Sequence, residues 1–477
     1  MNRKGIFAAA LAVLVSGWMT AGADLYRRAP DVLPGTLPEM RDPDYWIAQM
    51  DKPDEVLLTP DEIERMNGAY EEKMRSPDPF AGVHPDRLPK EDEANRLDRW
   101  PGRILAPMPW IRTMSPDSIA VIVREKIRED LEFMRKRQFG NFLAVEYAAR
   151  EIDDFEHEMA LDLVPDFVVT RDGIAVRTTR LRVVPSLFPE QMGILDNARY
   201  RWDIWNANLV KIGRPVTVLH ASRSGSHVFV LSDDGFGWVE SQDIAFGHSA
   251  EIKSFAGAGR FVVCTGDRVP FYTDKRCMYV SGWLRMGDRV PLEGNDDPSI
   301  VRVPARRSNG AFVAETAWLA RDADVSLDWL PYTRRNIVVI AFKLLDNPYD
   351  WTMAFYGRNH ETTYRDIFAC FGFRLPFHGS LFTHFGGDDR VAEPDMDTQA
   401  KYDMILAHEP FVTLHASRSN VGILLGSYNG VPISFNTNGY GYTDENGVGY
   451  EIRRACIVDT RMPPYFLENP VTFLELK

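Results

Sequence analysis

The feature that most restricts the fold of this chain is a change of pattern near Val164. From there on, short runs of β-forming residues are separated by Gly, Asp, Ser and Pro at intervals of about 8–12 residues, which is typical of small antiparallel barrels and sandwiches. The runs lie at 216–219, 228–231, 237–239, 261–264, 278–280 and 311–315. They form two units of about 80 residues each, which suits two consecutive small β-barrels.

The residues before this change predict helices that are separated by Pro-rich and charged segments. Thr59-Pro60-Asp61-Glu62 supplies a capping residue, Pro at the first helical position and Glu at the third. A longer helix is expected from Ser115 to about Arg137, because apolar residues recur there at helical spacing. A third helical stretch is expected over about 141–161.

The last part of the chain alternates helix and strand. Thr333 is expected to cap one helix, and a second helix is expected from about Thr362 to Phe371, with Gly372 as its stop. Four strands are predicted after it, at 411–414, 421–425, 431–435 and 452–458. This order predicts an α+β domain that is closed by an antiparallel sheet.

Residues 1–23 have the pattern of a secretory signal peptide. Two basic residues precede the apolar stretch 6–15, and Ala21-Gly22-Ala23 fits a small-x-small cleavage site. An uncleaved membrane anchor is the alternative, but a span needs about 20 apolar residues and Ser16 interrupts the stretch too early. We therefore expect cleavage near Ala23, no membrane span in the mature chain, and a periplasmic or secreted bacterial protein.

The net charge and the cysteine content argue against two classes of protein, those that bind nucleic acid and those built on a disulfide scaffold. The formal net charge is −13 and no basic tract stands out, which argues against nucleic acid as a partner. Four cysteines are too few for a disulfide scaffold. In an exported chain Cys264 and Cys277 could be bridged, since they flank a turn-rich strand pair, whereas Cys370 and Cys456 lie far apart. Four buried thiols are the other interpretation, and the sequence leaves both open.

Short motifs follow one another in a fixed order between residues 160 and 477. In the β-rich region they are Thr170-Arg171, Arg180-Leu181-Arg182, 215–220 and Gly237-Trp238-Val239; in the last domain they are 330–333, 336–338, 341–345, Pro348-Tyr349-Asp350-Trp351, Arg365-Asp366-Ile367-Phe368, Phe371-Gly372 and Leu375-Pro376. This succession resembles the NlpC/P60 cysteine peptidases, in the multidomain form with two bacterial SH3-like domains ahead of the catalytic one.

The resemblance implies a multidomain α+β fold. Its expected parts are an N-terminal helical and Pro-rich region at 24–160, SH3-like β-barrels at 161–247 and 248–325, and a papain-like α+β domain at 326–477. In the family this last domain hydrolyses a peptide bond in the stem peptide of peptidoglycan, commonly between γ-D-glutamate and a diamino acid. The reaction needs a thiolate at a helix N-terminus, a histidine base on the facing strand and a third residue that orients the base.

In this chain the positions that match the catalytic residues of the family carry other side chains. The nucleophile position is His360, and it follows Asn359, where the family has an acid that helps to hold the substrate amine. The base position is Asn420. The orienting position is Phe435 or Asn436, depending on a one-residue choice of alignment. Nucleophile, base and orienter are all replaced, so we expect no functional catalytic residue.

Other residues near the helix that carries His360 are poor candidates for catalysis or metal binding. Cys370 lies about 15 Å from His360 along an ideal helix, and we interpret it as a core residue. Converging His360, Glu361, His378 and His384 could hold zinc, but they lack the spacing of zinc ligands, so we expect neither a metal nor a cofactor. The residues expected to line the former substrate cleft are Tyr349, Trp351, Asn359, Glu361 and His378.

Three functions follow from this reading. The first is an exported, wall-associated pseudo-peptidase that binds a peptidoglycan stem peptide or a wall or periplasmic protein. The second is an active endopeptidase with altered, metal-assisted machinery. The third is a purely structural or assembly protein.

Overall fold

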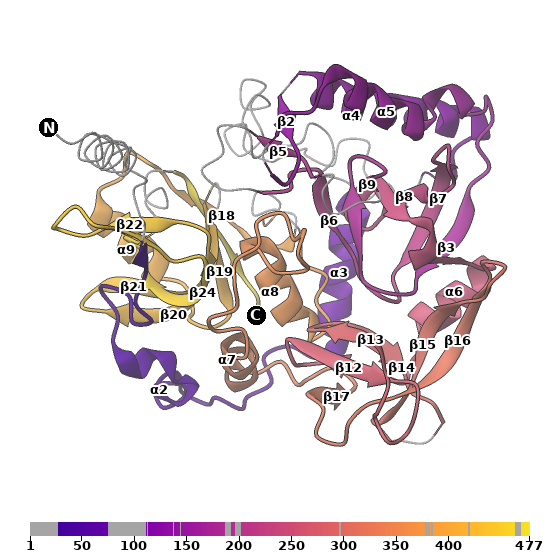
Figure 1. The fold of residues 1–477 in the computed structure, drawn as a ribbon. Coiled ribbons are helices and arrows are strands. Elements are labelled where there is room, and N and C mark those ends of the chain that lie inside the picture. The colour runs from indigo at the N-terminus through magenta and orange to yellow at the C-terminus, as the bar shows by residue number, and fades with distance from the viewer. Residues whose placement is uncertain are drawn as a thin grey trace, which may run out of the picture.

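The computed structural model describes residues 27–74, 111, 113–136, 138–143, 145–186, 192–195, 202–294, 297–376, 382, 385–417, 420–462 and 469–477. The expected signal peptide lies outside the described residues. The chain is a multidomain α+β protein, as the sequence predicts, with three β-rich parts that follow one another in chain order (Figure 1). None of the described helices has the length and apolar character that a membrane crossing requires.

The first β domain is a single seven-stranded sheet with the order β10-β3-β7-β8-β9-β4-β6. Its strands are β3 (Arg171–Ala175), β4 (Thr179–Arg182), β6 (Asn206–Val210), β7 (Pro215–Ala221), β8 (His227–Ser232), β9 (Gly235–Glu240) and β10 (Ile244–Phe246). Valines that face one another from β7 and β8, such as Val218 and Val230, fill its interior. Strands β7, β8 and β9 pair in succession, and a two-residue turn joins β8 to β9.

The second β domain consists of two small antiparallel sheets, ordered β14-β11-β17 and β13-β12-β16-β15. Its strands are β11 (Phe261–Cys264), β12 (Arg268–Tyr272), β13 (Val280–Arg285), β14 (Arg289–Pro291), β15 (Ile300–Arg306), β16 (Phe312–Trp318) and β17 (Val325–Leu327). Helix α6 (Ser249–Ala256) leads into it from the first β domain. Val262, Leu284 and Val301 are fully buried between the two sheets.

The C-terminal domain is built on a six-stranded antiparallel sheet with the order β18-β25-β19-β20-β21-β24. Its strands are β18 (Asp388–Ala392), β19 (Thr413–Ser417), β20 (Asn420–Tyr428), β21 (Val431–Asn438), β24 (Arg454–Asp459) and β25 (Val471–Glu475). Val421, Ile423 and Leu425 of β20 pack in the core with α7 (Arg334–Phe342) and α8 (His360–Ala369). Leu424 points to the opposite face and packs with Ile405 of α9 (Thr398–Leu406). Helices therefore cover both faces of the sheet.

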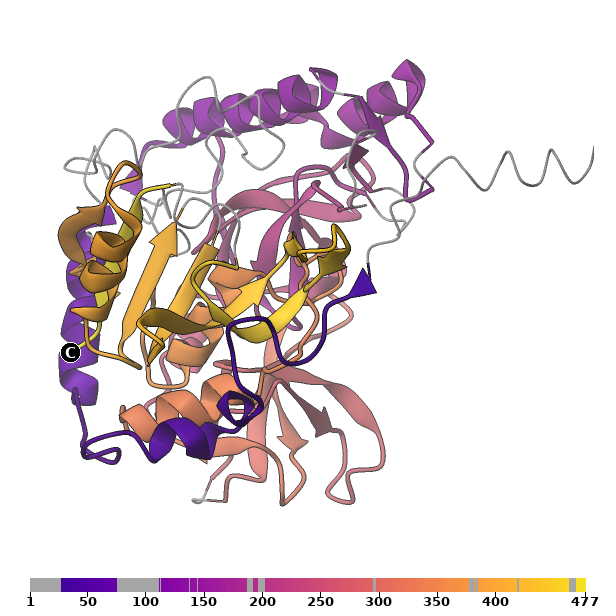
Figure 2. The ribbon, with the colours of Figure 1, turned by 90° about the vertical axis from the view of Figure 1, so that its left-hand side faces the viewer.

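The N-terminal region is not one unit, because its two described halves pack on different domains. Strand β1 (Arg27–Arg28) pairs with β23 (Gly449–Glu451), which also pairs with β22 (Gly441–Thr443). Helix α2 (Pro43–Ile47) lies beside α7, and α3 (Pro60–Met74) packs on the core of the C-terminal domain (Figure 2). Helices α4 (Pro116–Arg135) and α5 (Ala149–Met159) instead bury their apolar faces on the first β domain. Between α4 and α5 in the chain, the short strand β2 (Phe139–Gly140) pairs with β5 (Ile194–Leu195).

Most predicted helix starts coincide with observed caps. Thr59 and Glu62 form the expected capping box, with Glu62 N donating to Thr59 Oγ1 at 3.3 Å and Thr59 N donating to Glu62 Oε2 at 2.8 Å. Thr333 Oγ1 accepts a hydrogen bond from Asn336 N at 3.2 Å, as a cap should. Gly372 follows α8 with φ +96°, a conformation that suits a glycine stop.

Two predictions of secondary structure are wrong. The stretch 141–161 is helical only from Ala149, because Asn141 Oδ1 accepts hydrogen bonds from the backbone of Leu143 and Val145 and holds a turn there instead. The strand expected at 278–280 begins only at Val280, because the Asp274 carboxylate accepts from the backbone N–H groups of residues 276, 278 and 279.

Candidate functional site

The N-terminus of α8 is the place where the nucleophile of the resembled family is expected. Asn359 caps this helix: its Oδ1 accepts a hydrogen bond from Thr362 N at 2.8 Å, and Thr362 Oγ1 accepts one from Asn359 N at 3.0 Å. Its Nδ2 donates to the carbonyl of Trp351 at 3.0 Å. The amide of Asn359 is thus used at both ends to position α8, and it is not presented to a substrate amine.

His360 occupies the first helical position and is nearly closed off from solvent, with 6% of its surface exposed. Its Nε2 lies 2.9 Å from Oε1 of Glu361. Its ring lies parallel to the ring of Tyr349, with the two centroids 6.4 Å apart. Burial raises the pKa of Tyr349 well above its usual value, so this phenol stays neutral. The site holds an imidazole–carboxylate pair against an aromatic ring, and it holds no thiol.

The two asparagines at the expected base and orienting positions contact each other. Asn436 Nδ2 donates to Asn420 Oδ1 and, at 3.1 Å, to the carbonyl of Val421. Phe435 faces the other side of β21 and packs on Phe342 of α7, with 5.9 Å between ring centroids. Asn436, and not Phe435, is therefore the residue in contact with the base position. An amide takes up no proton near neutral pH, so this pair supplies no general base.

The contact between α8 and the sheet near this end is a pair of hydroxyl groups. Thr363 Oγ1 and Thr437 Oγ1 lie 2.8 Å apart and are both buried. Thr437 follows the asparagine pair on β21 but faces the helix, because successive side chains of a strand alternate between its faces. This hydrogen bond fixes the distance between helix and strand and leaves no charged group there.

Sequence reasoning missed the residues that reach this end of α8 from other parts of the chain. Trp202, which precedes β6 of the first β domain, makes edge contacts with Tyr349 and Trp351 at centroid distances of 5.7 and 6.2 Å. The guanidinium of Arg453 lies 5.9 Å from the centre of the Trp202 ring. Asn206 Nδ2 donates to the carbonyl of Thr352. The first β domain therefore forms one wall of the site, and no local pattern could have indicated it.

The cysteines are all free thiols in the structure, and none lies at the N-terminus of α8. Cys370 caps the C-terminal end of that helix and is fully buried; its Sγ donates to the carbonyls of Cys264 and Asp366 at 3.5 and 3.6 Å. Burial raises its pKa to about 12. Cys264 and Cys277 are not bridged. A thiol held in this way is inert as a nucleophile.

Neither of the remaining histidine arrangements makes an open catalytic site. His415 Nε2 and Ser434 Oγ lie 2.5 Å apart, but both residues are buried on the α9 side of the sheet, and burial lowers the pKa of His415 to about 3. His378 and His384 lie outside the described residues. Among the residues that are described, no three histidine, cysteine, aspartate or glutamate side chains are grouped closely enough to hold a metal ion.

Comparisons with known proteins support the fold at two levels. A family model for the SH3 domain of SH3b1 type matches residues 194–240, which run from β5 through β6 to β9 of the first β domain. An NlpC/P60 endopeptidase from Photobacterium damselae subsp. piscicida has a similar structure, with a TM-score of 0.69 and 14% sequence identity over 94% of this chain and 98% of that chain. An NlpC/P60 family protein from Bacillus cereus matches with a TM-score of 0.42 and 16% identity, over 63% of this chain and 98% of that one. No curated protein sequence matches the chain. The resemblance to the multidomain NlpC/P60 fold with an SH3-like domain is confirmed.

Proposed function

We propose that this chain is a catalytically degenerate NlpC/P60-like protein of the cell wall, which binds the stem peptide of peptidoglycan without cleaving it. The observation that carries the proposal is the set of side chains at the positions that match the catalytic residues of the family. His360 stands at the nucleophile position, and the asparagines at the base and orienting positions are hydrogen-bonded to each other. Hydrolysis of an amide by this scaffold requires a thiolate and a proton acceptor, and both are replaced.

Retained binding is supported by the surface next to His360. Tyr349, Trp351 and Trp202 are partly exposed aromatic residues from two different domains, and such residues are well suited to contact a peptide. Asn206 Oδ1 and Thr352 Oγ1 are buried and have no hydrogen-bond partner among the described residues. Buried polar atoms are normally satisfied by ordered water or by a ligand, so the junction has unused capacity for a polar molecule.

The proposed location is the periplasm or the outside of the cell. It rests on the signal-like pattern of residues 1–23 and on the SH3-like and NlpC/P60-like architecture. Glycan strands and stem peptides are found in this compartment, and a protein that has lost hydrolysis can still reach them there. A wall or periplasmic protein is the alternative partner.

The decisive experiment measures cleavage and binding on the same purified mature chain. Stem tripeptides and tetrapeptides that contain the γ-D-glutamyl–diamino acid bond are incubated with the protein and followed by mass spectrometry, while calorimetry measures tripeptide binding. We expect no turnover and measurable binding, with binding weakened at least about tenfold by Trp351→Ala, since aromatic contacts of this kind are worth roughly 1–2 kcal/mol or more. Trp283→Ala is the matched control, because Trp283 is 54% exposed on the second β domain.

A second candidate is an active hydrolase with altered machinery, and the His360–Glu361 pair favours it. Glu361 Oε1 lies 2.9 Å from His360 Nε2, and an imidazole that a carboxylate orients is an arrangement able to act on a water molecule. Turnover that is abolished by His360→Ala or by Glu361→Gln, or that is lost on adding a chelator, would establish this function and overturn the first. If the chain shows no turnover, does not bind the tripeptide and does not sediment with purified sacculi, a structural or assembly role is indicated.

A further inference from the structure

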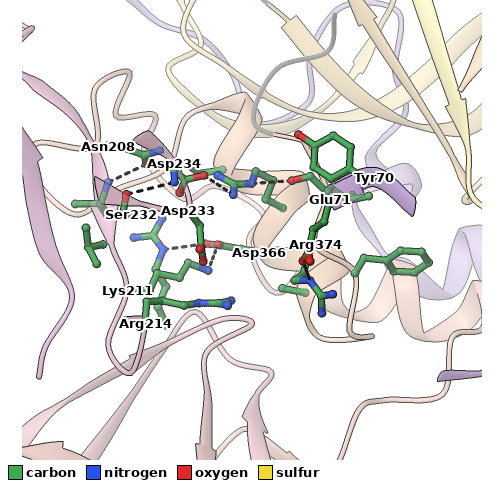
Figure 3. Close-up of a pocket in the computed structure, with 18 residues that line it drawn as sticks. Tyr70, Glu71, Asn208, Lys211, Arg214, Ser232, Asp233, Asp234, Asp366 and Arg374 are labelled. Carbon is green, nitrogen blue, oxygen red and sulfur yellow. Dashed lines mark hydrogen bonds and ion pairs between the residues drawn. The ribbon is translucent and has the colours of Figure 1, made fainter. Parts of the chain in front are cut away.

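A cavity lies on the flank of α8, where several parts of the chain meet. It has a volume of about 180 Å³ and is lined by the first β domain, by α3 and by the middle of α8 (Figure 3). Figure 3 shows Asn208, Lys211 and Arg214 on one side and Tyr70, Glu71 and Arg374 on the other, with Asp366 between them. The cavity is smaller than the roughly 300–1,000 Å³ of drug-sized pockets, so it suits a ligand no larger than a single amino acid or the end of a short peptide.

The wall of this cavity is highly charged, with five cationic and four anionic side chains. Most of them are paired across the domain boundaries. Lys211 and Arg285 bind Asp366. Arg365 NH2 lies 2.7 Å from Asp234 Oδ1, and Arg374 Nε lies 2.8 Å from Glu71 Oε1. Within each pair the two charges neutralise each other, so these side chains are not available to bind a ligand.

Two opposite charges remain. Among the described residues, the guanidinium of Arg214 and the carboxylate of Asp233 make neither a hydrogen bond nor an ion pair. Arg214 is half-buried, whereas the Asp233 side chain is exposed and marks where the cavity meets solvent. Arg214 lies close enough for its positive charge to favour the ionised form of the Asp233 carboxyl group.

Both residues are held by rigid turns. Arg214 follows Gly213, whose φ of +77° allows a tight turn that closes with Arg214 N donating to the Lys211 carbonyl at 3.1 Å. Asp233 lies in the two-residue turn between β8 and β9, which Ser232 stabilises by donating from Oγ to the Gly235 carbonyl at 3.1 Å. The backbone that carries the cation and the anion is thus fixed before any ligand arrives, which lowers the entropic cost of binding.

We propose that this cavity binds a small zwitterion, namely an α-amino-acid head group, with its carboxylate on Arg214 and its ammonium on Asp233. A guanidinium binds a carboxylate through two parallel hydrogen bonds, and a carboxylate accepts from an ammonium. A simple anion would leave Asp233 unpaired beside it, and a simple cation would be repelled by Arg214. The ligand that satisfies both groups carries both charges on neighbouring atoms.

Two molecules present this head group at the cell wall. One is a free amino acid, and the other is the end of a diamino acid, free or within a stem peptide. The inference is independent of the proposed function, because neither Arg214 nor Asp233 belongs to the N-terminus of α8; Thr362 of that end lines the cavity but takes no part in the proposed contacts. The site assignment stands or falls with Arg214 and Asp233 alone.

Calorimetry on the mature chain tests the inference with L-alanine, D-alanine and meso-diaminopimelate as probes. Propionate and ethylamine serve as probes that carry one charge each. We expect at least one zwitterion to bind, each single-charge probe to bind at least about tenfold more weakly, and Arg214→Gln and Asp233→Asn each to weaken zwitterion binding about tenfold or more. Binding of alanine would indicate a free amino acid, and binding of diaminopimelate alone would indicate the diamino acid.

The controls are charge changes of the same kind elsewhere. Arg307→Gln and Asp322→Asn remove exposed charges from the second β domain and should leave binding unchanged. Circular dichroism and a thermal melt establish that each variant folds, and the zwitterion should raise the melting temperature of the unaltered chain but not of the two cavity variants. The inference is overturned if no zwitterion binds, if propionate binds as tightly as alanine, or if both cavity variants bind normally.

Discussion

The Nε of Arg358 lies 2.8 Å from Oδ2 of Asp366, and both side chains are buried. The same carboxylate oxygen accepts a hydrogen bond from Nε of Arg285 at 2.8 Å, while the other oxygen contacts Lys211. Arg285 belongs to the second β domain and Lys211 to the first. One carboxylate in the middle of α8 therefore holds both β domains to the C-terminal domain. The side chains that hold the domains together differ from those at the positions that match the catalytic residues of the family, so the architecture does not depend on the latter.

Replacing Asp366 with Asn should destabilise the protein strongly. The substitution removes the anion shared by two buried guanidinium groups, those of Arg285 and Arg358, and by the partly buried Lys211. Removing one partner of a buried ion pair typically costs about 3–5 kcal/mol. Urea unfolding followed by fluorescence measures the change. Asp324→Asn serves as control, since its pair with Lys343 is 58% and 30% exposed and should contribute less than about 1 kcal/mol. A loss for Asp366→Asn as small as that of the control would contradict the prediction.

The same carboxylate should make stability depend on acid. Burial alone would raise the pKa of Asp366, but Lys211, Arg285 and Arg358 outweigh it and hold the pKa well below the usual value of 3.8. A carboxyl group with a lowered folded-state pKa contributes its full stability above the unfolded pKa, and it loses this contribution as the pH falls below that value. The difference in unfolding free energy between the unaltered chain and Asp366→Asn should be constant from pH 7 to about pH 5 and shrink below about pH 4. A difference that stays level down to pH 2 would exclude this linkage.

Asn359 should matter for stability through its role as a helix cap. Asn359→Ala removes the acceptor for Thr362 N and the donor to Trp351, and loss of an N-cap typically costs about 0.5–2 kcal/mol. Asn359→Asp is the matched variant: it keeps the cap acceptor and adds a negative charge near the helix N-terminus, so its helix-capping contribution should be retained. Thermal and urea unfolding of both variants test this. Equal stability of the alanine variant and the unaltered chain would show that the cap is dispensable.

The sequence was sufficient for the parts of the fold that depend on local pattern. The capping box at Thr59, the helix from Pro116 and the alternating strand at 421–425 are set by neighbouring residues, and the structure has all three. The stretch after Asn141 was predicted as helix because its composition allows one, whereas a side-chain hydrogen bond to the backbone decides otherwise. Local competition of this kind leaves no periodic signal.

The candidate site was less accessible to sequence reasoning, because it is assembled across domains. The matching positions His360 and Asn420 could be identified along one continuous motif order. The contact of Trp202 with Trp351 joins segments that are far apart in the chain, and it arises only when the first β domain docks. Arg214 and Asp233 likewise lie in ordinary turns. Only when α8 and α3 pack beside them do these two charges line a cavity in which they form no ion pair with the described residues.

Thiol chemistry offers a direct test of the absence of a catalytic cysteine. Cys264, Cys370 and Cys456 are fully buried, and burial raises the pKa of each thiol, to about 12 for Cys370 and Cys456. Cys277 is partly exposed. With a chromogenic disulfide reagent at neutral pH we expect one thiol per chain to react before unfolding and four after it in urea. Cys277→Ser should remove the fast phase, and Cys370→Ser should leave it intact. A fast phase that disappears in Cys370→Ser instead would mean that this thiol is reachable and reactive, and the interpretation of a lost nucleophile would then fail.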